Sequence, residues 1–268
     1  MITSSSNAQV KRVAQLNRKS KERRLAGVFV AEGRKMFLEA PREWLESVFV
    51  TENFENEHKE LLNGIDYEVV EQRIFSQMSD TQTPQGILCL VKMPAYSLKE
   101  VLDHPSPLLL VLEDLQDPGN LGTIIRTAEG AGVTGILLSK NTVDLFNPKT
   151  IRSTMGSVYR MPFLYVDDLC QVLPELKRRS IRTFAAHLQG KNTYDGESYI
   201  GGTAFFVGNE GNGLSRRLSD CADCLIRIPM EGQVESLNAA VASAVLMYES
   251  CRQRRRAGDG GRKVLTKN

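Results

Sequence analysis

The chain has 268 residues, of which 41% are hydrophobic and 25% are charged, and its formal net charge is +2. These values are ordinary for a soluble globular protein of one or two domains. No apolar run approaches the roughly 18–20 residues that a membrane span needs, and residues 1–9 lack the apolar stretch of a secretory signal. We therefore expect a cytoplasmic protein with no membrane partner.

Strands and helices alternate along the first third of the chain, which favours an α/β layer structure. We predict strands at 27–31, 47–51, 67–70 and 86–91 and helices at 7–17, 33–40, 55–63 and 73–79. Residues 93–107 hold three prolines and several polar residues, which is typical of a domain boundary. The sequence thus predicts a domain over 1–95, a second over 106–256 and a basic tail over 257–268.

The second domain alternates again, and it begins with an apolar run over 108–112 that suits a buried parallel strand. We predict further strands at 135–139, 163–166, 182–188, 203–208 and 224–228, and helices at 120–130, 147–157, 168–179 and from about residue 236. Apolar positions 237, 240, 241, 244, 245 and 248 of the last helix follow helical spacing. Its alanines allow another element to approach closely.

Basic residues gather at both ends of the chain. Residues 1–24 and 252–268 each hold seven basic residues against one acidic residue, a net charge of +6 at each end, so that the middle carries −10. Lysine and arginine gain affinity for phosphates by releasing counterions. We expect these ends to be arms that contact a polyanion, the alternative being solvated tails without a partner.

The five cysteines are odd in number and widely scattered, which argues against a disulfide framework. Cys221 and Cys224 form a C-x-x-C pair, but a zinc site would need a second pair of ligands, which the sequence lacks. A thioredoxin-type site would need the pair at the start of a helix, whereas residues 225–229 are predicted as a strand. We predict two reduced cysteines beside a strand and no metal site.

Residues 130–135 fit the pattern G-x-G-x-x-G, which is typical of dinucleotide sites. That function requires the glycines to follow a strand and open a helix, so that the helix N-terminus faces the ligand. Here they follow a predicted helix and precede a predicted strand. We therefore interpret them as a helix C-cap and a turn.

Three segments place chemically active residue types at the end of a predicted strand. The first, residues 112–122, is a turn rich in Asp, Pro and Gly in which Asn120 is placed to begin a helix carrying Arg126. If Asn120 still lies in the turn, its amide can brace the loop while Arg126 points along the helix. The alternative is a capping asparagine and a surface arginine.

The second segment, residues 205–215, follows an apolar strand with three glycines, two asparagines and the carboxylate of Glu210. Such a loop can take positive φ angles and let a ligand reach the backbone. Ligands of α/β proteins bind at the carboxyl ends of the strands. The alternative is an ordinary turn in which Ser215 caps the next helix.

The third segment, residues 226–240, is a strand, a loop stiffened by Pro229 and a helix start that carries Ser236 and Asn238. Free N–H groups and polar side chains gather at the start of a helix. Capping accounts for one of these two polar residues but not for both.

Together the three segments closely resemble the motifs of the SpoU (TrmH) family of RNA ribose methyltransferases, within the SPOUT superfamily. They occur in order over about residues 108–252, the second as F-V-G-N-E-G-N-G-L-S and the third as I-P-M-E-G-Q-V-E-S-L-N. Residues 5–92 are similar, more weakly, to the substrate-binding domain of the family through 29–33 and 83–87.

The resemblance implies a trefoil-knotted α/β domain with a parallel sheet, whose knot binds S-adenosylmethionine, preceded by a smaller α/β RNA-binding domain. By matching position, the cofactor would contact Gly208, Ile228, Met230 and Leu237, mostly through backbone groups. The family needs no metal. It forms homodimers through the knotted domain, a role that the small residues of the last helix fit.

The activity implied is transfer of a methyl group from S-adenosylmethionine to a ribose 2′-hydroxyl of RNA. Arg126 would orient the hydroxyl and phosphate, Asn120 would fix the first loop and Arg126, and Glu210 would organise the second loop. Ser236 and Asn238 would hold the third loop and the ribose. A free arginine is almost always protonated, so the general base stays unassigned.

The extra N-terminal domain is more typical of members that act on ribosomal RNA, and we expect 23S ribosomal RNA as the partner. Three alternatives stay open: an enzyme for the ribose of transfer RNA, an enzyme that methylates a base, and an RNA-binding protein that has lost catalysis.

Overall fold

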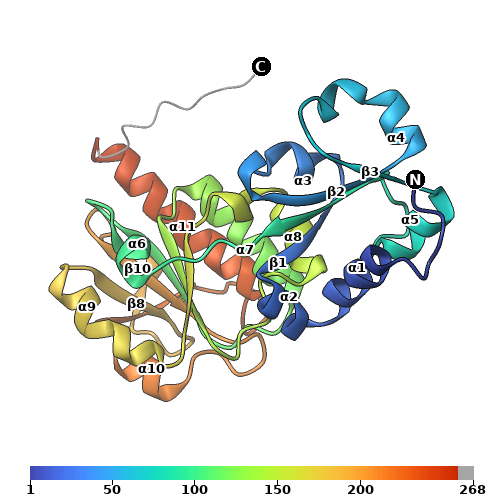
Figure 1. Ribbon diagram of the computed structural model, residues 1–268. Coiled ribbons are helices and arrows are strands. Elements are labelled where there is room, and N and C mark those ends of the chain that lie inside the picture. Colours follow the sequence, from blue (N-terminus) through green and yellow to red (C-terminus); the bar gives the residue numbers. More distant parts are fainter. Residues whose placement is uncertain (259–268) are drawn as a thin grey trace. The chain divides into compact units, whose positions relative to one another are not determined.

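The computed structural model describes residues 1–258 and divides into two compact units (Figure 1). Unit 1 comprises Met1–Ala95 and Asp144–Arg160, and unit 2 comprises Tyr96–Val143 and the chain from Met161 onward. Unit 1 thus includes a segment that is distant in sequence from the rest of it. Most of the predicted basic tail, from residue 259, lies outside the described residues.

Unit 1 is built on a mixed four-stranded sheet in the order β1-β4-β2-β3, in which β4 is antiparallel to both neighbours and β2 is parallel to β3. Its strands are β1 (Val28–Glu32), β2 (Leu45–Thr51), β3 (Glu68–Val70) and β4 (Ile87–Lys92). Its helices are α1 (Ala8–Arg18), α2 (Ser20–Ala26), α3 (Arg34–Glu39), α4 (Glu52–Glu57), α5 (Gln72–Met78) and α8 (Pro148–Thr154).

The N-terminal segment packs on unit 1 through its apolar residues and does not form an arm, although most of its basic side chains are exposed. Val13 and Leu16 of α1 are buried with Phe49 of the sheet. The Arg23 side chain is only 3% exposed, pairs with Asp144 and donates to the Leu16 carbonyl at 2.5 Å. The expectation of an arm over residues 1–24 was therefore wrong, because charge counts do not show that an amphipathic helix carries the charges on one face and core residues on the other.

Unit 2 is built on a parallel seven-stranded sheet in the order β7-β6-β5-β10-β8-β11-β9. Its strands are β5 (Leu108–Leu112), β6 (Gly135–Ser139), β7 (Phe163–Val166), β8 (Arg182–Ala186), β9 (Asn192–Thr193), β10 (Thr203–Val207) and β11 (Cys224–Arg227). The central strands β5 and β10 are buried at every position, which confirms the prediction of a buried parallel strand at 108–112.

The helices of unit 2 are α6 (Leu98–Leu102), before the first strand; α7 (Pro118–Ala131), α9 (Leu173–Arg178) and α10 (Arg216–Asp220), between strands; and α11 (Ala239–Arg256), after the last strand. The short α6 lies inside the predicted boundary region, where no helix was predicted, and it begins with a capping box formed by Ser97 and Glu100. Gly132 ends α7 at φ 77°, and Gly135 opens β6, which confirms that the G-x-G-x-x-G pattern is a helix end and a turn.

The last helix presents a different face to the core from the one that its apolar spacing suggested. It buries Ala240, Ser243 and Met247, whereas Val241 and Tyr248 are each 49% exposed. The buried Ser243 hydroxyl donates to the carbonyl of Ala239 at 2.7 Å, so this polar group is satisfied within the helix. Small side chains therefore allow α11 to pack on its own unit and leave larger apolar residues facing outward.

Candidate functional site

The loops that follow β5, β10 and β11 project from the same edge of the parallel sheet, because the carboxyl ends of parallel strands lie together. In the first loop, the Glu113 carboxylate accepts hydrogen bonds from the Ser215 backbone and hydroxyl at 2.6 and 2.7 Å. Asn209 in the second loop donates its amide to the carbonyl of Asp114 at 2.7 Å. Side-chain contacts thus join the first loop to the second.

Asp117, not Asn120, is the N-cap of α7. The Asp117 carboxylate accepts from the Asn120 backbone at 2.7 Å, and Pro118 occupies the first turn, where no intrahelical partner for its missing N–H is needed. The helix therefore begins two residues before the predicted start. As a result, the Asn120 side chain is free from capping and projects from the first helical turn.

Three residues from the three segments form one hydrogen-bonded chain. The side-chain Nδ2 of Asn120 donates to Glu210 Oε1 at 2.9 Å, and the side-chain Oδ1 of Asn120 accepts from Asn238 Nδ2 at 3.0 Å. Glu210 also accepts from the backbones of Gln116 and Asp117 at 3.2 and 3.3 Å. Asn120 is thus the central member that connects the second loop to the third.

The second loop closes on itself at Gly208. Asn209 and Gly213 exchange two backbone hydrogen bonds at 3.0 and 2.9 Å, and the Asn209 side chain accepts from the backbone of Gly211 at 2.8 Å. A Cβ atom at Gly208 would lie 2.1 Å from the Gly213 carbonyl carbon and 2.2 Å from the Leu214 nitrogen. This close approach of two backbone segments requires glycine at position 208.

Within the described residues, the backbone of the third loop between Ile228 and Leu237 makes no hydrogen bonds. Among the described residues, no hydrogen bond involves any residue from 228 to 237, although Ile228, Met230 and Leu237 are each partly buried. The loop ends at Asn238, whose side chain caps α11 by accepting from Ala240 and Val241 at 2.9 and 3.3 Å. The predicted helix start near residue 236 was therefore early by three residues.

Arg126 and Ser236 stand apart from this hydrogen-bonded chain. Arg126 lies exposed on α7, and the Ser236 side chain is exposed in the third loop. Within residues 1–258 neither side chain has a hydrogen bond, and none joins Asn120 to Arg126. The structure therefore brings together Asn120, Glu210 and Asn238 and leaves Arg126 and Ser236 open to a ligand.

The environment of Glu210 keeps its carboxylate ionised. Desolvation of the carboxylate acts to raise the pKa of Glu210, but hydrogen bonds from the Asn120 amide and from the backbones of Glu210, Gln116 and Asp117 together outweigh it. The pKa of Glu210 therefore lies below its ordinary value. An ionised carboxylate only accepts hydrogen bonds, which matches the donors that surround it.

We expect Glu210→Gln to lower the free energy of unfolding near neutral pH, because its amide would turn a donor toward one of the backbone N–H donors. A carboxyl group whose pKa is lower in the folded state contributes stability above its unfolded pKa of about 4.3 and loses it as the pH falls through the folded value. Urea unfolding at several pH values should therefore show a difference from the wild type that shrinks toward acid pH. Glu235→Gln, an exposed carboxylate of the third loop, is the control; a pH-independent difference for Glu210→Gln would contradict the assignment.

Several contributors were not singled out from the sequence, although local signals pointed to some. Asp117 precedes Pro118 and could have been recognised as an N-cap. Asp114, at φ 53°, accepts from the hydroxyl of Ser139, the last residue of β6, at 2.6 Å. No local sequence pattern predicts the hydrogen bond between Ser139 and Asp114.

The cysteine pair lies where it was predicted, since Cys224 opens β11 and Cys221 lies just before it. All five cysteines are free. Within the described part of the chain, no group of three or more His, Cys, Asp or Glu residues is arranged to hold a metal ion. The same residues include no helix long and apolar enough to cross a membrane.

Comparison with known proteins identifies the family of each part of the chain. Residues 107–248 match the SpoU rRNA Methylase family, and residues 7–89 match an MRM3-like substrate binding domain. The chain is 34% identical to the 23S rRNA (guanosine(2553)-2′-O)-methyltransferase RlmP of Bacillus subtilis, over 92% of this chain and 97% of that protein.

Two solved structures are similar over nearly their whole length. The SpoU methyltransferase AviRb from Streptomyces viridochromogenes, in complex with AdoMet, has a TM-score of 0.84 and 26% identity, covering 93% of this chain and 98% of that one. The AdoMet-bound rRNA methyltransferase from Sinorhizobium meliloti has a TM-score of 0.81 and 29% identity, covering 94% and 97%. The chain therefore belongs to the SpoU methylase family and combines its α/β parallel-sheet domain with an N-terminal substrate-binding domain.

Proposed function

We propose that this protein transfers a methyl group from S-adenosylmethionine to a ribose 2′-hydroxyl of 23S ribosomal RNA, in the cytoplasm. The hydrogen-bonded chain from Glu210 through Asn120 to Asn238 carries the proposal, because it joins all three segments that resemble family motifs into one site. The choice of ribosomal RNA is supported by the 23S rRNA methyltransferase activity for which the Bacillus relative is named, and by the N-terminal domain.

The third loop fits S-adenosylmethionine, which supplies an electrophilic methyl group when bound. Partly buried backbone groups at Ile228, Met230 and Leu237 have no intramolecular partner among the described residues and are available to a polar ligand. The apolar side chains of these residues suit an adenine and a thioether chain. We assign Gly208 to the same cofactor site, and its lack of a side chain keeps the second loop closed.

Arg126 is the residue that we assign to the attacking ribose. Methyl transfer needs the 2′-oxygen held in line with the bond that breaks. The exposed guanidinium of Arg126 offers five N–H donors in a planar fork, which suits a phosphate and a neighbouring hydroxyl. Ser236 and Asn238 lie at the end of the third loop. We propose that Ser236 contacts the ribose and that Asn238 holds the third loop in position.

The incorporation of labelled methyl groups tests this function. The full-length protein would be incubated with S-adenosylmethionine and unmodified transcripts of 23S ribosomal RNA or of transfer RNA. A 2′-O-methyl group protects the adjacent phosphodiester bond from alkaline cleavage, whereas a methylated base does not. We expect label in 23S RNA, with one phosphodiester bond protected from alkali. Label in transfer RNA, or label in 23S RNA with no protected bond, would favour one of the alternative enzymes. The absence of label would favour an RNA-binding protein without catalysis.

We also propose a homodimer through a knotted domain formed by unit 2. The outward face of α11 supports it, because Val241 and Tyr248 are half exposed on an ordered helix. We expect Val241→Glu to give a monomer, since an unpaired charge in a packed interface costs several kcal/mol. Light scattering during gel filtration measures the mass. Leu188→Glu, at an exposed residue outside α11, is the control; a wild-type monomer or an unchanged variant mass would contradict the proposal.

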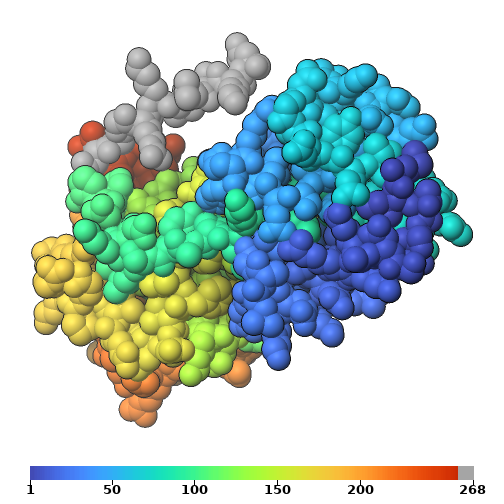
Figure 2. All heavy atoms as spheres, viewed as in Figure 1, coloured from blue at the N-terminus to red at the C-terminus, as the bar shows by residue number. Residues whose placement is uncertain are grey.

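The exposed cations of α1 and α2 are proposed to contact RNA phosphates. Lys11, Arg18, Lys19 and Lys21 are all exposed, and the N-terminal residues form part of the surface in Figure 2. Deletion of this segment would remove core residues, so we expect the informative change to be Lys11→Gln with Arg18→Gln. RNA affinity should fall, and the dependence of log affinity on log salt should weaken by about 1–2. Anisotropy titrations at several salt concentrations measure both; an unchanged salt slope would contradict the contact.

A further inference from the structure

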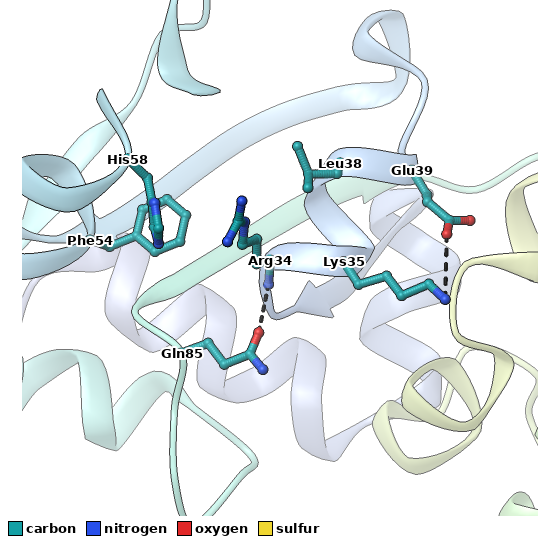
Figure 3. A pocket seen from close by; sticks show the side chains of 7 residues that line it. All are labelled: Arg34, Lys35, Leu38, Glu39, Phe54, His58 and Gln85. Atoms are coloured by element: carbon teal, nitrogen blue, oxygen red, sulfur yellow. Dashed lines mark hydrogen bonds and ion pairs between the residues drawn. The ribbon is translucent and has the colours of Figure 1, made fainter. Parts of the chain in front are cut away.

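Unit 1 contains a hollow with a volume of about 540 Å³, distinct from the methyl-transfer site (Figure 3). This volume lies within the range of about 300–1,000 Å³ that is usual for small-ligand sites. Its lining combines cationic, aromatic, aliphatic and amide side chains, among them Arg34, Lys35, Leu38, Phe54, His58 and Gln85.

The hollow is formed where the two N-terminal segments that resemble the family meet. Gly33, which ends the first, takes φ 100°, and its backbone donates to the Ile87 carbonyl at 3.0 Å. Gln85 of the second segment accepts from the Arg34 backbone at 2.8 Å through Oε1. Its Nε2 amide has no hydrogen bond among residues 1–258, which leaves a donor free beside the hollow.

One wall of the hollow is aromatic and supported from behind. The Phe54 ring is only 4% exposed and meets the His58 ring edge-on, with 4.8 Å between the ring centroids. Phe54 therefore holds His58, which is partly exposed, in place as a flat surface. Leu38 adds an aliphatic side chain that is 51% exposed. Figure 3 shows these side chains on different elements around the same space.

The charged residues leave this site positive. The Arg34 side chain is exposed and has no hydrogen bond or ion pair among the described residues. Lys35 lies 3.7 Å from Glu39, but Arg160 also pairs with Glu39 at 2.7 Å. The single carboxylate is therefore shared between two cations, and the guanidinium of Arg34 is available to an anion.

We infer that this hollow binds one unpaired nucleotide of the RNA substrate, with its base stacked against His58 and Leu38 and its phosphates near Arg34 and Lys35. The Gln85 amide donates to an acceptor on the base edge. An exposed flat ring, a free amide and adjacent cations are the combination by which proteins hold single-stranded nucleotides. A paired base does not fit, because its stacking faces are covered. The inference depends on RNA being the substrate but not on catalysis.

Fluorescence anisotropy of the full-length protein with two labelled RNAs tests the inference: a hairpin with an unpaired loop and a blunt duplex with the same paired stem. We expect His58→Ala to weaken hairpin binding about tenfold, in line with the loss of one stacked base. His58→Phe should restore it, and duplex binding should hardly change. A wild type that binds both RNAs equally, or a His58→Ala variant that loses affinity for both alike, overturns the inference.

Arg34→Met provides a second variant at an exposed position that does not affect folding through the core. We expect it to weaken hairpin binding and to reduce the salt slope by about 0.7, the value for one contact to single-stranded RNA. Arg73→Met removes the same charge from another exposed position of unit 1 and should have a smaller effect. Equal losses for the two variants would mean general attraction and would overturn the site. Failure of methyl transfer by the wild type, with these binding differences intact, would reject only the proposed activity.

Discussion

Arg126→Ala is expected to reduce methyl transfer at least about a hundredfold while S-adenosylmethionine affinity stays nearly unchanged. Arg126 is exposed on α7 and outside the hydrogen-bonded chain that joins the three loops, so its removal should leave the loops in place. Loss of a group that orients reacting atoms and stabilises charge typically costs a factor of about 10²–10³ in rate. Single-turnover assays with saturating cofactor and RNA measure the rate, and calorimetry measures cofactor binding.

Arg126→Lys and Arg216→Ala distinguish the expected role from a general charge effect. Lysine keeps the charge but loses the planar fork, so only partial activity should return. Arg216 is an exposed arginine of the same unit, and its removal should leave the rate within about twofold. Loss of cofactor affinity in Arg126→Ala would contradict the assignment to the ribose, because it would place Arg126 at the cofactor.

Gly208→Ala is expected to abolish cofactor binding and to destabilise unit 2 by about 1–3 kcal/mol, as overpacking of a closed structure does. The added Cβ atom would meet backbone atoms of Gly213 and Leu214 at 2.1 and 2.2 Å, and no side-chain rotation relieves such contacts. The loop would have to open, which would move Glu210 away from Asn120. Urea unfolding measures stability, and calorimetry measures cofactor affinity.

Gly211→Ala is the matched control within the same loop. A Cβ atom there would lie 3.5 Å from the Asn209 side chain, an ordinary contact, and its φ angle is not in the left-handed region. We expect this variant to keep both stability and cofactor affinity. If Gly208→Ala behaved in the same way, close backbone approach would not be the reason for glycine at position 208.

Local signals predicted much of the secondary structure. The strands at 108–112, 135–139 and 163–166 match β5, β6 and β7 at both ends, because each is a short apolar run bounded by turn residues. Element ends were less accurate where capping decided them. Asp117 starts α7 earlier than Asn120 would have, and Asn238 starts α11 later than Ser236 would have.

The sequence alone indicated the parallel α/β domain, the three chemically active segments and the family that they resemble. Only the tertiary structure decided which residues of those segments meet. Asn120 reaches Glu210 across 90 positions and Asn238 across 118, and such contacts depend on how strands are ordered in the sheet, which periodicity does not encode. The same reason explains why Arg23 lies buried beside Asp144 and why α11 turns Val241 and Tyr248 outward: a local pattern shows that a face is apolar, but only packing decides what covers it.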